Sequence, residues 1–153
     1  MSSEPFALDS NILVHAVDGR DPLRQSLAQQ IVAAASALDC RVPHHAIAEF
    51  YAIATYKLKL DHGTAISAAR QWMRLFPGIP TSRSAIETAM QMRAVNRFSF
   101  WDAMLVATAE EDGCQVFISE DMHDGARLGA IVIRTPFSDG AIAPAVRALL
   151  GLS

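Results

Sequence analysis

The feature that most constrains the fold of this chain is a regular alternation of short apolar segments with longer segments patterned at helical spacing. When strands alternate with helices, each helix carries the chain back to the same edge of the sheet, and the strands pair in parallel. The pattern therefore predicts an α/β fold with a largely parallel sheet. The expected strands are residues 6–8, 40–42, 78–80, 115–119 and 130–134.

Helix start and stop signals indicate where the intervening helices begin and end. Asp21 and Pro22 are typical of a helix start, because Asp caps free backbone N–H groups and Pro fits the first helical position. Ser84 and Glu87 have the spacing of a capping box and predict another start at Ser84. The expected helices cover residues 22–38, 44–57, 63–76, 84–96, 99–113 and 143–149.

Length and composition predict one soluble domain with a single core. The chain has 153 residues, of which 51% are hydrophobic and 19% charged, a balance that excludes a disordered chain. No apolar run approaches the ~20 residues that cross a bilayer. Residues 1–5 lack the basic start and apolar stretch of a secretory signal. We therefore expect a cytoplasmic protein in which Cys40 and Cys114 are buried free thiols rather than a disulfide or a nucleophile.

No internal repeat or linker divides the chain. We expect one α/β domain over residues 1–137, followed by a C-terminal tail over residues 138–153. The Ala/Leu pattern of the tail predicts a short helix packed on the same domain. The same pattern also fits a helix that covers a partner, and the sequence does not decide between the two.

The net charge of −3 argues against a protein that binds nucleic acid over its whole surface. A phosphate ligand must therefore be held locally. Two means are present in the sequence, namely metal ions on clustered carboxylates and small basic groups. The basic groups are Lys57 with Lys59 and Arg93 with Arg97.

Four acids stand at expected strand ends and helix starts, each between apolar neighbours. Asp and Glu are seldom buried unless they are paired or bound to a metal, and several together repel one another. A divalent cation with a preference for oxygen ligands, such as Mg²⁺ or Mn²⁺, removes that penalty. The carboxyl ends of parallel strands meet at one edge of a sheet, so we expect the four to converge there. They are Asp9, Glu49, Asp102 and Asp121.

Each of these acids also has a simpler explanation. Asp9 could cap the helix that follows it, and Asp102 could belong to a capping box opened by Ser99. Glu49 could be an exposed residue on a helix, and Asp121 could belong to a turn. Their joint occurrence is what favours a shared site.

The segments around these acids form a pattern, of which Ser99-Phe100-Trp101-Asp102 and Ser119-Glu120-Asp121 are the more specific parts. The segments are residues 8–14, 47–51, 98–103 and 118–125. Together they resemble the PIN-domain nucleases, and within them are most similar to the VapC-like ribonuclease toxins of toxin–antitoxin pairs. The resemblance covers nearly the whole chain, from Phe6 to about Phe137.

The resemblance implies a three-layer α/β/α sandwich with a mostly parallel central sheet. It implies a cytoplasmic endoribonuclease that uses Mg²⁺ or Mn²⁺ to hydrolyse RNA, forms a homodimer and is silenced by a small antitoxin. It further implies that the four acids form a quartet around one or two metal ions, with three as direct ligands and two neighbouring polar residues in support. The implied ligands are Asp9, Asp102 and Asp121, Glu49 completes the quartet, and Asn11 and Ser119 support it.

Two aromatic residues near the acids have uncertain roles. His45 departs from the family pattern, in which an uncharged polar residue is more common. It lies four residues before Glu49, so the two could belong to a zinc-like site, although no third soft ligand has a matching spacing. Trp101 is expected to pack in the core beside Asp102 rather than to stack on a base. The roles of the nearby acids Glu120 and Asp124 stay open.

Two alternative functions remain. The first is a catalytically silent PIN-like module that only binds a partner. The second is another Mg²⁺-dependent phosphohydrolase, such as a phosphatase that forms an aspartyl-phosphate on Asp9. That chemistry usually requires a second Asp two residues after the nucleophile, where this sequence has Asn11.

Overall fold

A six-stranded sheet forms the centre of the molecule. The computed structural model describes residues 4–153, so residues 1–3 of the expected domain lie outside the described residues. The strand order is β3-β2-β1-β4-β6-β5. All neighbours pair in parallel except β5 and β6, which are antiparallel. The strands are β1 (Phe6–Leu8), β2 (Cys40–Pro43), β3 (Gly78–Ile79), β4 (Val116–Ile118), β5 (Arg127–Leu128) and β6 (Ile131–Arg134).

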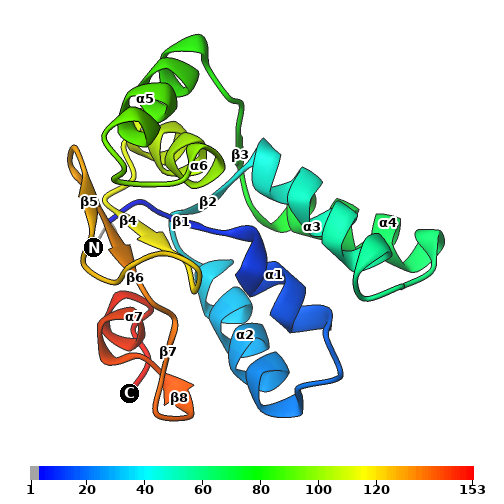
Figure 1. Cartoon of the computed structure of the whole chain (residues 1–153). Helices are drawn as coiled ribbons and strands as arrows, with labels where there is room; N and C mark the ends of the chain where they lie inside the picture. The colour runs from blue at the N-terminus through cyan, green and yellow to red at the C-terminus, as the bar shows by residue number, and fades with distance from the viewer. Residues whose placement is uncertain (1–3) are drawn as a thin grey trace.

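Helices cover both faces of this sheet. In Figure 1, α1 (Ser10–Val17) and α2 (Pro22–Ala35) lie below the strands, and α5 (Arg83–Ala94) and α6 (Phe100–Glu111) lie above them. The paired helices α3 (His44–Tyr56) and α4 (His62–Leu75) lie to the right. This arrangement confirms the predicted three-layer α/β/α fold with a mostly parallel sheet.

The two central strands are buried on both faces and set the geometry of the candidate site. Phe6, Leu8, Phe117 and Ile118 are fully buried, as expected where helices cover a parallel sheet on both sides. In the register of β1 with β4, Leu8 pairs with Ile118. Both strands therefore end at the same level, and the residues that follow them lie side by side.

Most helices begin close to the predicted position, but the predicted start of α5 at Ser84 was wrong. The cap is Ser82, whose hydroxyl accepts the N–H of Ala85 at 3.0 Å. The Ser84 hydroxyl contacts the Glu111 carboxylate instead. Ser82 has no acid three residues later, so the Ser84–Glu87 spacing gave the stronger signal in the sequence. Strands β5, β7 (Phe137–Ser138) and β8 (Ala141–Ile142) were not predicted, because each has two residues and none of them stands out as a separate apolar segment between two helices, as β3 does.

The C-terminal segment packs on the main core. Strands β7 and β8 pair through a turn at Asp139 and Gly140, which have φ angles of 53° and 73°. Asp-Gly suits such a hairpin turn because both residues tolerate positive φ. The following helix α7 (Pro144–Leu149) buries Val146 and, just beyond its end, Leu150 in the same apolar cluster as the central strands.

The predicted state of the cysteines is confirmed. Cys40 and Cys114 are both buried free thiols. Burial raises the pKa of Cys40 and raises the pKa of Cys114 to about 11, so neither is a thiolate near neutral pH. Among residues 4–153, no helix is long and apolar enough to cross a membrane.

We expect the substitution Phe50→Ala to lower the free energy of unfolding by about 3–5 kcal/mol, because it leaves a cavity in the core. Phe50 is fully buried on α3, and its ring meets the Trp72 ring of α4 edge to face at 5.9 Å. Urea unfolding measures the change. Tyr56→Ala is the matched control, since Tyr56 ends the same helix and is 88% exposed. A loss no larger for Phe50→Ala than for Tyr56→Ala would contradict this packing.

Candidate active site

Asp9 lies directly after β1 and caps the N-terminus of α1. Its Oδ1 accepts the N–H of Ser10 at 2.7 Å. The N–H of Asp9 donates to the carbonyl of Ile118 at 3.0 Å, which joins the end of β1 to the end of β4. The residue is only 4% exposed. Helix capping and membership of a shared site are thus compatible, because the cap uses one carboxylate oxygen and the other faces β4.

A hydrogen-bonded network joins Asp9 to the loop after β4. The Ser119 hydroxyl donates to Asp9 Oδ2 at 2.7 Å and accepts the N–H of Asp121 at 3.2 Å. The Asn11 amide donates to Asp9 Oδ2 at 3.3 Å and to Asp121 Oδ2 at 3.1 Å. The N–H of Glu120 in turn donates to Asn11 Oδ1 at 3.3 Å. The structure therefore brings together the sequence-predicted residues Asp9, Asn11, Ser119 and Asp121.

Glu49 and Asp102 approach this network from two other helices. Asp102 lies in the first turn of α6, where its N–H donates to the Ser99 hydroxyl at 3.2 Å, so Ser99 is the helix cap. Glu49 lies midway along α3, and its buried Oε1 has no hydrogen-bond partner among the described residues. His45 Nε2 lies 3.5 Å from this oxygen, which is too long for a hydrogen bond.

Burial and mutual repulsion disfavour the ionised forms of these acids. Burial is the largest cause that raises the pKa of Asp9 to about 6, and the charges of Glu49 and Asp102 add to it. Hydrogen bonds from Ser119 and Ser10 act in the opposite direction. Burial likewise raises the pKa of Glu49, with help from Asp102 and Asp121. Burial also raises the pKa of Asp102. The hydrogen bond with Ser99 acts in the opposite direction, and the charge of Asp121 raises the pKa further.

The donor chemistry of this site fits a hard divalent cation. All four acids offer carboxylate oxygens, which Mg²⁺ and Mn²⁺ prefer, and the unpartnered Glu49 Oε1 is available as a ligand. Within the described part of the chain, no three His, Cys, Asp or Glu side chains already lie close enough together to share an ion. Binding would therefore require the carboxylates to turn inward against their repulsion, which the charge of the cation would offset.

The two nearby acids whose roles were left open make other contacts. Glu120 Oε1 lies 2.9 Å from His15 Nε2, and Glu120 also forms an ion pair with Arg24. Asp124 accepts the N–H of Thr135 at 2.9 Å. Both acids thus hold the loop after β4 to neighbouring elements.

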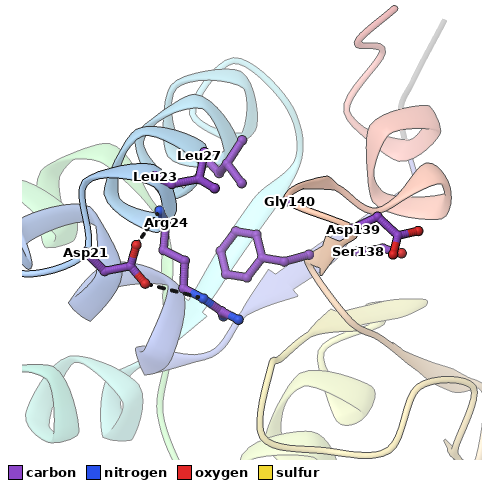
Figure 2. Close-up of a pocket in the computed structure, with 8 residues that line it drawn as sticks. Asp21, Leu23, Arg24, Leu27, Ser138, Asp139 and Gly140 are labelled. Atoms are coloured by element: carbon purple, nitrogen blue, oxygen red, sulfur yellow. Dashed lines mark hydrogen bonds and ion pairs between the residues drawn. The ribbon is translucent and has the colours of Figure 1, made fainter.

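A pocket of about 210 Å³ lies between α2 and the β7–β8 hairpin. Figure 2 shows Arg24 of α2 beside Asp21, on the side of the pocket opposite Asp139 of the hairpin. The Arg24 guanidinium lies 5.1 Å from the centre of the Phe137 ring. None of the quartet acids lines this pocket. A separate cavity of about 260 Å³ does border the site, with Asn11, Asp121 and Lys57 in its lining.

The expectation that Trp101 packs in the core was wrong. Trp101 is 57% exposed, and its ring stacks on His45. In the sequence, Trp101 follows Ser99 and Phe100 at the start of α6 and comes two residues before Ala103. This pattern alone does not show which side of α6 faces the sheet. For His45, the described residues offer no set of three ligands that would complete a zinc site.

Comparison with known families decides what kind of domain carries this geometry. The family model of the PIN domain matches residues 6–123, a segment that contains all four acids. The chain belongs to the PIN domain family. A search of curated proteins gave no match.

Solved structures with a similar fold include other PIN domains of toxin–antitoxin systems. The toxin VapC20 of Mycobacterium tuberculosis, which cleaves the sarcin–ricin loop, matches with a TM-score of 0.62 at 16% identity, over 73% of this chain and 86% of VapC20. VapBC2 of Rickettsia felis, bound to a DNA fragment from its promoter, matches with a TM-score of 0.60 at 12% identity, over 85% and 97% of the two chains. A toxin–antitoxin complex of Klebsiella pneumoniae matches with a TM-score of 0.59 at 21% identity, over 82% of this chain and 94% of the matched chain. At these identities, the similarity shows the fold of this PIN domain.

We expect Asp9→Asn to raise the free energy of unfolding by about 1–3 kcal/mol in EDTA at about pH 7.5. The folded-state pKa of Asp9, about 6, exceeds the ordinary value of 3.8. The folded protein therefore loses stability as the pH rises between these values, because ionisation favours the unfolded chain. Asn carries no charge and still caps α1, so the variant avoids this loss. Urea unfolding measures both proteins.

The same comparison at about pH 4 is the control, because the folded wild type then carries a protonated Asp9 and the advantage of the variant should disappear. An Asp9→Asn protein that is no more stable than the wild type at the higher pH would contradict the raised pKa of Asp9.

Proposed function

We propose that this PIN domain is a divalent-metal-dependent endoribonuclease and acts as the toxin of a toxin–antitoxin pair. The observation that carries the proposal is the convergence of four carboxylates from distant parts of the chain. Burial and the charges of the other acids raise the pKa values of three of them. Such a cluster lowers the stability of the fold, which a protein without catalytic activity has no reason to give up, and it suits the binding of a cation. The acids are Asp9, Glu49, Asp102 and Asp121.

We infer the roles of the residues from the family resemblance and from their positions. Asp9, Asp102 and Asp121 would hold Mg²⁺ or Mn²⁺, and Glu49 would complete the set or orient the attacking water. When bound, the ion would neutralise phosphate oxygens and lower the pKa of that water. Asn11 and Ser119 keep the carboxylates of Asp9 and Asp121 in place through their hydrogen bonds.

Single-stranded or looped RNA is the substrate that best suits this site, because an unpaired strand can bend into a narrow acidic crevice. Lys57 borders the cavity next to Asp121, and Arg93 and Arg97 line a shallow pocket beside Ser99 at the start of α6. These cations would contact the RNA backbone on either side of the acids. Hydrolysis by an activated water would leave a 5′-phosphate and a 3′-hydroxyl.

The comparison supports an antitoxin as one proposed partner. The similar structures from Rickettsia felis and Klebsiella pneumoniae are toxin–antitoxin complexes. We infer for this chain a small antitoxin that covers the acidic site, and a homodimer as the active form in the cytoplasm.

The structure offers less support for the two alternatives. A phosphatase that forms an aspartyl-phosphate on Asp9 usually needs a second Asp two residues later, whereas this chain has Asn11 there, and its amide donates to Asp9 and Asp121. A silent binding module would have no need of the complete quartet. Incubation with a mixed RNA pool and with a generic phosphate ester, with and without Mg²⁺, separates the alternatives. The proposal requires that the protein cleave the RNA but not the phosphate ester, and that it do so only when Mg²⁺ is present.

Asp9→Asn and Asp102→Asn should each lower the rate of RNA cleavage by about 100-fold or more, because each removes a charged ligand while it keeps the shape of the side chain. Gel analysis of a labelled RNA in Mn²⁺ measures the rate. Asp124→Asn is the matched control, since Asp124 lies on the same loop as Asp121 but, within residues 4–153, contacts the Thr135 N–H and Arg134 rather than the quartet. Full metal-dependent activity in Asp9→Asn would show that the assignment is wrong.

A further inference from the structure

An exposed tryptophan stands beside the acidic site. Trp101 is 57% exposed, although its neighbours in α6 at positions 103–109 are buried. A large apolar side chain in water gives up the favourable free energy of burial, so a solvent-facing Trp needs a reason. Its position immediately before Asp102 suggests that the reason concerns the site.

The Trp101 ring is held in a defined orientation. It lies parallel to the His45 ring, with an angle of 3° between the planes and 5.3 Å between the ring centres. The Phe100 ring contacts it edge to face at 5.0 Å. Three rings from α3 and α6 thus form a small aromatic surface, and the exposed Trp101 does not have to be ordered when a ligand arrives.

This aromatic surface is continuous with the acidic site. His45 lies one turn before Glu49 on α3, and its Nε2 is 3.5 Å from the Glu49 carboxylate. On α6, Trp101 directly precedes Asp102, whose charge acts on Glu49. A ligand that reaches the quartet from this side therefore passes over the two stacked rings.

We propose that Trp101 and His45 form a stacking platform for one base of the RNA substrate, an inference that rests on the function proposed above. The acids repel the phosphates of an approaching strand. Stacking on an aromatic ring attracts the uncharged base instead and depends little on which base it is. The platform would therefore hold the strand through one base, so that a phosphodiester next to that base lies over the carboxylates.

The test measures binding separately from cleavage. The Asp9→Asn protein is titrated in EDTA with a single-stranded oligoribonucleotide of about ten nucleotides, within the range that one binding fold covers. Stacking is expected to quench the fluorescence of Trp101, while Trp72, which is 6% exposed, supplies a constant background. An abasic oligomer of the same length carries the same phosphates and should leave the fluorescence unchanged.

Substitutions then measure the contribution of the ring. In the Asp9→Asn background, Trp101→Leu should weaken binding of the oligonucleotide by about 5- to 150-fold, the loss of one base–aromatic stack, and Trp101→Phe should restore most of it. Tyr56→Ala is the matched control, because Tyr56 is an exposed aromatic residue at the far end of α3 from His45. It should bind as the parent does. The thermal midpoint of each variant checks that the fold is intact.

The outcomes distinguish the platform from the proposed function. If the wild type cleaves RNA and Trp101→Leu binds and cleaves equally well, the platform is wrong and the proposed function stands. If the oligonucleotide quenches Trp101 but the wild type does not cleave RNA in Mg²⁺ or Mn²⁺, the platform stands without that function. Equal quenching by the abasic oligomer, or quenching only by an arginine-rich peptide, would overturn the platform, because the ring would then serve phosphates or a protein partner.

Discussion

The repulsion among carboxylates at one edge of the sheet is the constraint on which the rest of the site depends. The cost is met first by hydrogen bonds: Ser119 and Asn11 donate to Asp9, and Asn11 also donates to Asp121. These bonds exist because β1 and β4 are adjacent and end at the same level, with Leu8 opposite Ile118. The remaining cost is seen in the raised pKa values of Asp9, Glu49 and Asp102, and a divalent cation is the natural means to offset it.

Helix capping and site formation use the same residues here. Asp9 caps α1 with one oxygen and meets Ser119 with the other. Asp102 belongs to the first turn of a helix that Ser99 caps. Residues at the starts of helices are fixed by backbone hydrogen bonds, so their backbones are held at this edge of the sheet before any ligand arrives, and only the carboxylates have to turn toward a cation. The simpler explanation of each acid is therefore part of the mechanism by which the fold places it.

Much of this geometry could be predicted from the sequence, because the alternation of apolar strands with helical segments dictates a parallel sheet and the ends of its strands meet at one edge. Asp9 and Asp121 follow from that rule directly. Glu49 and Asp102 were expected at the same edge from their positions near helix starts, and the resemblance to a known family supported that expectation, since a helix pattern does not state how far a side chain reaches toward a neighbouring strand. Trp101 was assigned to the core in error, because the apolar residues of α6 surround the helix almost completely and conceal which side faces solvent. The stack with His45 joins residues far apart in the chain, and no local pattern reports it.

The measurement that tests the central claim most directly is isothermal titration calorimetry of the protein with Mn²⁺ in a chelator-free buffer near neutral pH. If the four carboxylates form a shared pocket that requires a cation, the wild type will bind Mn²⁺ saturably, and Asp121→Asn will bind it about tenfold more weakly or worse. Asp124→Asn, on the same loop but outside the quartet, will bind as the wild type does. Absence of Mn²⁺ binding by the wild type, or equal binding by the Asp121→Asn protein, would contradict the account.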